Sequence, residues 1–86
     1  MRQAKHPSRE PIIKRLRRAE GHLHSVVEML TAKRSSSDIA QQLQAVESAV
    51  TAAKRLLVHD QMQHCLSQGD ASGGTLRELK HLTKFL

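Results

Sequence analysis

Two histidines and the chain's single cysteine lie close together in the segment HDQMQHCL, residues 59–66. His59, His64 and Cys65 carry imidazole and thiol groups, which bind Cu(I), Zn(II), Ni(II) or Co(II). In a helix, Gln61 lies one turn before Cys65 on the same side, whereas His59 points elsewhere. The segment is therefore the place in this sequence where metal chemistry is most concentrated.

The cluster is incomplete as a metal site, because one thiolate and one adjacent imidazole leave coordination positions open. Further donors are available at His6 in the N-terminal arm, at His22 and His24, or in a second copy of the chain. A lone cysteine is also common as a small buried hydrophobic residue. From these residues alone, a metal site and a purely structural role both stay open.

The segment that positions the cluster, residues 38–66, has no glycine or proline and is rich in Ala, Leu and Gln. Such residues lose little side-chain freedom in a helix. A helix of this length is roughly 40–45 Å long, whereas a compact chain of this size has a radius of gyration of about 12 Å. We therefore expect self-association to cover its apolar stripe. That stripe steps by four and three residues and consists of Ile39, Leu43, Val46, Val50, Ala53 and Leu57.

The same spacing recurs upstream, which predicts a second long helix. With the turn signals, we predict helices at about 9–32, 36–67 and 75–86, after a loose arm at residues 1–7. The connection between the first two helices is short, so they should form an antiparallel hairpin. The sequence thus predicts a single all-α domain, a helical hairpin followed by a short C-terminal helix. The upstream stripe is Ile12, Leu16, Ala19, Leu23, Val26 and Leu30.

Composition limits the class of protein. The 86 residues include 14 basic and 8 acidic side chains, a formal charge of +6, and one aromatic residue, Phe85. An excess of positive charge indicates a polyanionic partner, most often nucleic acid, with a merely solvated basic surface as the alternative. One cysteine cannot form an intramolecular disulfide, and no apolar run approaches the ~18 residues of a membrane span. Without a signal-peptide pattern at the N-terminus, we expect a cytoplasmic location.

The basic residues gather on the two long predicted helices. An antiparallel hairpin brings the start of the first helix beside the later part of the second, which predicts one basic patch that neutralises phosphates. The chain has no helix-turn-helix spacing and no aromatic residues to stack on single-stranded bases. Duplex DNA, contacted through phosphates and shape, is therefore the favoured partner. The predicted contacts are Lys14, Arg15, Arg17, Arg18, Lys54 and Arg55.

Three segments resemble the CsoR/RcnR family of small all-helical bacterial repressors, which sense copper, nickel, cobalt, formaldehyde or sulfur species. They are IIKRLRRAEGHLHSVVEML (12–30), DIAQQLQAVESAV (38–50) and HDQMQHCL. The AEGHL segment and the HD-x-x-x-HC ending are similar to the nickel/cobalt branch. The resemblance implies a three-helix protomer that dimerises as an antiparallel four-helix bundle, usually pairs into a tetramer, and binds operator DNA without a conventional reading helix.

The resemblance also implies where an inducer would bind. The family's ligand positions fall on Ser36, Gln61 and Cys65, and only Cys65 keeps a usual ligand type. Copper(I) sensing through two thiolates, sulfur sensing and formaldehyde sensing do not fit a chain with Ser36. A rearranged Ni(II) or Co(II) site of Cys65, His64 and His6 remains. The alternative is a repressor with no metal response that senses another small molecule.

The leading hypothesis is a homodimeric or homotetrameric repressor that controls a nickel/cobalt efflux or resistance gene and releases DNA when an inducer binds. A metal storage or delivery protein and a helical adaptor are alternatives from other classes. No paired carboxylates and no nucleophile with a positioned base occur in the sequence, so we do not expect an enzyme.

Overall fold

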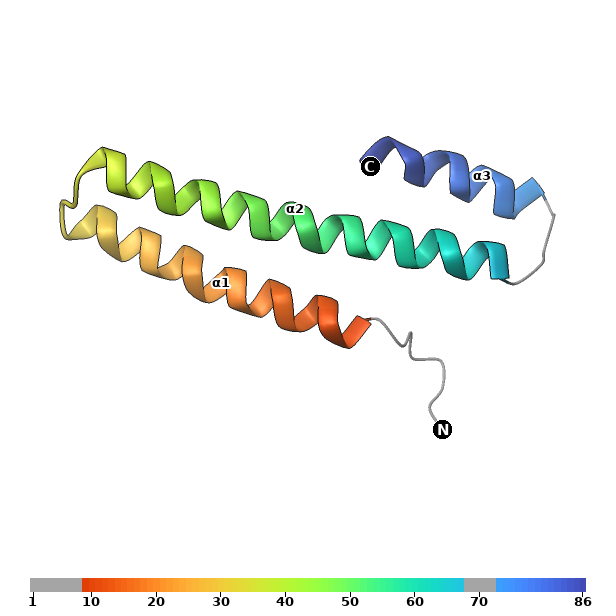
Figure 1. Cartoon of the computed structure of the whole chain (residues 1–86), viewed down its shortest axis with the longest axis horizontal. Helices are drawn as coiled ribbons and strands as arrows, with labels where there is room; N and C mark the ends of the chain where they lie inside the picture. The colour runs from red at the N-terminus through yellow and green to blue at the C-terminus, as the bar shows by residue number, and fades with distance from the viewer. Residues whose placement is uncertain (1–8, 68–72) are drawn as a thin grey trace.

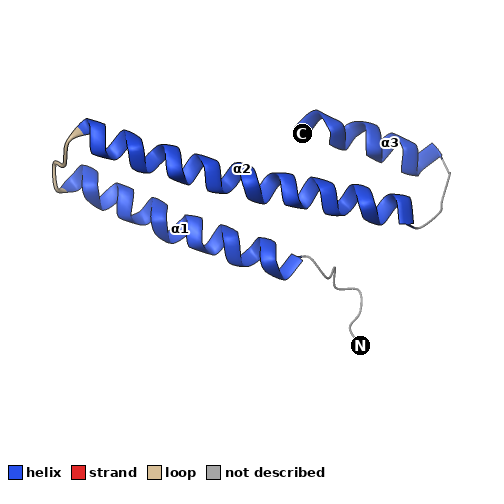
Figure 2. Ribbon diagram, in the orientation of Figure 1, coloured by secondary structure: helices blue, strands red, loops and turns tan. Residues whose placement is uncertain are grey.

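A computed structural model describes residues 9–67 and 73–86 of the chain. It contains three α-helices, α1 (Arg9–Thr31), α2 (Ser36–Ser67) and α3 (Gly73–Leu82), followed by a short 3-10 helix, η1 (Thr83–Phe85). Helices α1 and α2 run antiparallel, and α3 folds back along the C-terminal half of α2 (Figure 1). No strand occurs among the described residues (Figure 2). The predicted all-α hairpin with a short third helix is confirmed.

The helix boundaries differ slightly from the predicted ones. Helix α1 ends at Thr31, one residue earlier than predicted, and α3 begins at Gly73, two residues before the predicted start at 75. The chain then tightens into η1, so the α-helix stops at Leu82 rather than continuing to residue 86. The arm predicted at residues 1–7 lies outside the described residues.

The hairpin turn ends α1 with a Schellman motif. The Arg34 N–H donates to the Met29 carbonyl oxygen at 3.0 Å, and the Lys33 N–H donates to the Leu30 carbonyl oxygen at 3.2 Å. Lys33 has a φ of 60°, a left-handed backbone conformation that glycine usually adopts at the end of a helix. These bonds satisfy carbonyls at the end of α1 and reverse the chain.

The first turn of α2 is capped by Ser35. Its side-chain oxygen accepts the Asp38 N–H at 3.1 Å, and its carbonyl oxygen accepts the Ile39 N–H at 3.0 Å. The Arg34 guanidinium lies 3.8 Å from the Asp38 carboxylate across the turn, on the exposed surface. Of the three consecutive serines at residues 35–37, Ser35 is therefore the N-cap of α2.

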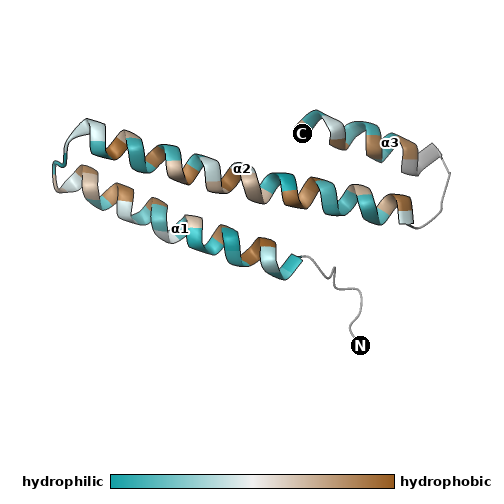
Figure 3. Cartoon of the chain, in the orientation of Figure 1, coloured by the Kyte–Doolittle hydropathy of each residue, from teal (hydrophilic) through white to brown (hydrophobic). Residues whose placement is uncertain are grey.

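The apolar stripe of each long helix is divided into two halves. Every second member, seven residues apart, is buried between α1 and α2, while the members between them remain 41–59% exposed. Apolar residues recur along all three helices (Figure 3). The described helices therefore cover only half of their own stripes. The buried half is Ile12, Ala19, Val26, Ile39, Val46 and Ala53, and the exposed half is Leu16, Leu23, Leu30, Leu43 and Val50.

The protomer is one helix thick. Its Cα atoms extend 54 × 32 × 13 Å with a radius of gyration of 17.5 Å, against about 12 Å for a compact chain of this length. Since a helix with side chains is about 10–12 Å across, the hairpin has two broad faces and no enclosed interior. None of the described helices is long and apolar enough to cross a membrane.

The buried side of α2 changes along its length. Near the turn it carries Val46 and Ala53, which face α1, and further on it carries Val58 and Cys65. At about 100° per residue, this is a rotation of about 120° around α2. Cys65 contacts α3, in which Leu79 and Leu82 are half-buried. Helix α3 thus covers the end of α2 that extends beyond α1.

Candidate functional site

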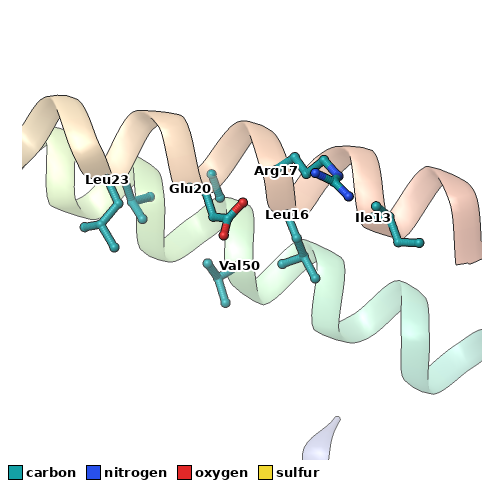
Figure 4. A pocket seen from close by; sticks show the side chains of 8 residues that line it. Ile13, Leu16, Arg17, Glu20, Leu23 and Val50 are labelled. Carbon is teal, nitrogen blue, oxygen red and sulfur yellow. The ribbon is translucent and has the colours of Figure 1, made fainter.

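An apolar groove of about 430 Å³ runs between α1 and α2 on one face of the hairpin. Leu16 and Leu23 from α1 lie beside Val50 from α2 along this groove, with Arg17 and Glu20 at its edge (Figure 4). These three apolar side chains are 41–46% exposed. The groove therefore consists of the half of the stripes that the chain itself does not cover.

The opposite face of the same two helices is basic. Arg15, Arg18 and His22 of α1 line a hollow with Ala49 and Ala52 of α2. At about 100° per residue, these three side chains point about 150° away from the groove-lining side of α1. We call the set Arg15, Arg18, His22 and Arg55 the basic face; Arg55 lines the adjoining hollow, which shares Ala52.

The six basic residues predicted to contact DNA point to different sides of the two long helices. Arg15, Arg18 and Arg55 lie on the basic face, whereas Arg17 lines the apolar groove on the other side of α1. Lys54 is exposed but points about 100° away from Arg55 around α2. Lys14 is exposed on α1 and lines neither hollow. The six residues therefore do not line one hollow of a single protomer, and their contact with DNA stays a prediction.

A partly buried hydrogen bond joins the two long helices next to the basic face. The His22 Nε2 lies 2.6 Å from the Gln42 Oε1, which joins α1 to α2 in a partly buried position. Gln42 is 23 residues before Cys65, so about 35 Å of helix separates His22 from the thiol. Within one protomer, His22 is therefore not a partner of Cys65 in a metal site.

Cys65 is held between α2 and α3. It is 7% exposed, and its thiol donates to the Glu78 Oε1 at 3.5 Å while its Sγ accepts from the Gln61 Nε2 at 3.8 Å. Burial raises the pKa of the Cys65 thiol, and the hydrogen bond and negative charge of Glu78 raise it further, against a smaller lowering by Gln61. The thiol is thus protonated near neutral pH and bridges two helices.

The predicted metal ligands are only partly brought together. Cys65 is buried against α3, whereas His64 is exposed, and His6 lies outside the described residues. Ser36 is at the opposite end of α2, about 44 Å along the helix from Cys65, so it reaches the thiol only from a second copy. Among the described residues, no three His, Cys, Asp or Glu side chains form a group that could hold a metal. The described donors of one protomer therefore do not complete a metal site, and a site that includes His6 stays a prediction.

Sequence reasoning missed Glu78. It is the sole acidic residue after Asp70, in an otherwise basic C-terminal segment, and it lies beside the apolar residue Leu79. A lone carboxylate next to the packed side of a short helix is the signal that could have indicated a polar partner across the helix contact. Its pairing with Cys65 depends on how α3 folds back, which the sequence pattern did not specify.

The chain is similar to known proteins over nearly its whole length. The family model described as "Metal-sensitive transcriptional repressor" matches residues 8–86. The chain belongs to this family. The copper-sensing transcriptional repressor CsoR of Mycobacterium ulcerans is 32% identical over 76 residues, covering 85% of this chain. The copper-sensing repressor RicR of Mycobacterium tuberculosis is 33% identical over 61 residues, covering 71% of this chain.

The chain spans less than two thirds of the length of these two relatives. The chain spans 65% of the length of the M. ulcerans relative and 64% of that of RicR. Among solved structures, the nickel-responsive transcriptional regulator InrS matches with a TM-score of 0.80 and 30% identity, covering 99% of this chain and 100% of that one.

The resemblance to CsoR/RcnR repressors is confirmed, and a family of repressors agrees with the expected absence of enzymatic activity. Placement in the nickel/cobalt branch stays a prediction.

The contact between Cys65 and Glu78 predicts a shift in thiol reactivity. In Glu78→Gln, the thiol loses a carboxylate acceptor and a nearby negative charge, both of which raise its pKa. We expect the pH midpoint for alkylation of Cys65 by iodoacetamide to move to lower pH. The matched control is Glu47→Gln, an exposed carboxylate of α2 in another hollow. An unchanged or higher midpoint in Glu78→Gln would contradict the contact.

Proposed function

We propose that this chain is a DNA-binding transcriptional repressor that works as a homo-oligomer. The observation that carries the proposal is the arrangement of the hairpin, with an apolar groove on one face and the basic face on the other. Membership of a family of metal-sensitive repressors supports it. A repressor of chromosomal genes acts in the cytoplasm, in keeping with the location expected from the sequence.

The two faces support two different contacts, self-association through the apolar groove and DNA binding through the basic face. A second copy seated in the groove covers Leu16, Leu23 and Val50 and leaves the basic face of each copy directed outward. Two or four copies then present repeated sets of guanidinium groups at fixed separations, which suits contacts with phosphates along a duplex. An inducer that favours one arrangement of the bundle over another changes the spacing of these sets, with a coupling free energy of typically about 1–3 kcal/mol.

DNA binding by the basic face predicts a defined salt dependence. Selection from a randomised duplex library, followed by fluorescence anisotropy on the enriched site, gives the dependence of affinity on salt. We expect a steep slope for the native chain, and a slope smaller by about one for each phosphate that Arg15→Gln or Arg18→Gln no longer neutralises. Arg34→Gln, at the distant hairpin turn, is the control. A native slope near zero, or no enrichment, would refute the repressor proposal.

For the inducer, we propose Ni(II) or Co(II) bound with Cys65, His64 and His6. One thiolate with imidazoles suits these ions, whereas Cu(I) prefers two soft sulfur donors and the chain has a single cysteine. The likeness to a nickel-responsive regulator supports this choice, although the curated relatives are copper-sensing. The alternative, a member without metal response, is favoured by the hydrogen bonds that already occupy the Cys65 thiol.

Metal titration separates the two inducer proposals. Reduced protein is titrated with Ni(II), Co(II), Cu(I) and Zn(II) while thiolate charge-transfer absorption is followed, and the titration is repeated with Cys65→Ala and His64→Ala. We expect tight Ni(II) or Co(II) binding that both substitutions abolish, with Gln63→Ala, an exposed neighbour, as the control. Binding no tighter than about 10 μM, a standard free energy near −7 kcal/mol, would contradict a metal inducer and support the alternative.

A further inference from the structure

Helix α3 and η1 carry a second group of positive charges, separate from the basic face. Arg77, Lys80, His81 and Lys84 are all exposed and line one shallow hollow. We call this set the α3 ridge. The ridge plays no part in the contact between Cys65 and Glu78.

The α3 ridge points away from the rest of the protomer. At about 100° per residue, its side chains are directed about 180° from Leu79 and Leu82, the half-buried residues of α3. Glu78, the acidic residue of this helix, is turned toward the Cys65 thiol at 3.5 Å. The packing of α3 thus removes its single negative charge from the ridge side and concentrates the positive charges there.

Nothing in the described part of the protomer neutralises the α3 ridge. The ion pairs there include His24 with Glu28 and Arg34 with Asp38, both far from α3. Within the ridge, His81 makes an aromatic contact with Phe85, with ring centroids 5.9 Å apart. Three permanently charged side chains on one helix side, without a carboxylate partner among the described residues, are complementary to a polyanion.

We propose that the α3 ridge is a second phosphate-contacting surface for duplex DNA, in addition to the basic face. The inference rests on the proposed repressor function. From Arg77 to Lys84 the ridge is about 10 Å long, which matches about three phosphates along one strand. In this assignment, α3 both covers the end of α2 and extends the positive surface beyond α1 and α2.

The test compares two variants that lose the same charge. Lys80→Gln with Lys84→Gln removes two charges from the ridge, and Lys33→Gln with Arg34→Gln removes two from the hairpin turn. Affinity for a fluorescein-labelled duplex carrying the enriched site is measured between 50 and 200 mM salt by anisotropy. For the ridge variant we expect the slope of log affinity against log salt concentration to be smaller by about two per bound protomer. Over this fourfold range of salt, its loss of affinity is then about twelvefold smaller than that of the native chain. The turn variant should keep the native slope.

Circular dichroism and sedimentation on both variants verify that fold and oligomeric state are unchanged. Equal slopes for the native chain, the ridge variant and the turn variant would overturn the inference while leaving the repressor proposal intact. A native slope near zero would refute the repressor proposal and the inference with it. Loss of binding to phosphatidylglycerol vesicles by the ridge variant, with an unchanged DNA slope, would overturn the inference in favour of a membrane contact.

Discussion

A single hairpin cannot cover both halves of the apolar stripes on its two long helices. Residues seven apart, such as Ala19 and Val46, are buried between α1 and α2, but their neighbours on the same stripes, such as Leu23 and Val50, remain 44–46% exposed. Apolar residues that step by four and three form two rows of side chains along a helix, and one antiparallel helix covers only one of these rows. Because the protomer is one helix thick, no described segment of the chain covers the second row.

This constraint organises the functional surfaces. The uncovered row defines the apolar groove on one face, so the opposite face is free to carry Arg15 and Arg18. Helix α2 extends beyond α1, and α3 closes over that extension, where Cys65 meets Glu78 at 3.5 Å. The thiol thus lies at the junction between α2 and α3. The groove, the basic face and the contact between Cys65 and Glu78, on which the proposed association, DNA contact and sensing depend, all involve the long helix α2.

Much of the fold followed from periodicity, whereas the site depended on three-dimensional detail. The stripes and the short connection between them predicted the hairpin, because helical spacing and turn signals act locally. The burial of alternate stripe residues follows from the rotation of α1 against α2, which spacing alone does not set. The placement of Arg17 and Arg15 on different sides of α1, by contrast, follows from helical spacing. Glu78 was missed because its contact with Cys65 joins residues 13 apart across an α2–α3 packing that depends on tertiary structure.

Thermal unfolding at different protein concentrations tests most directly whether a second copy completes this fold. If association covers the apolar groove, Tm rises as concentration increases over roughly a hundredfold range, because the associated native state is favoured by mass action. Leu23→Lys places a charge in the groove and should lower Tm, whereas Ser48→Lys, away from the groove on α2, should retain the native dependence. A Tm independent of concentration in the native chain would contradict the account.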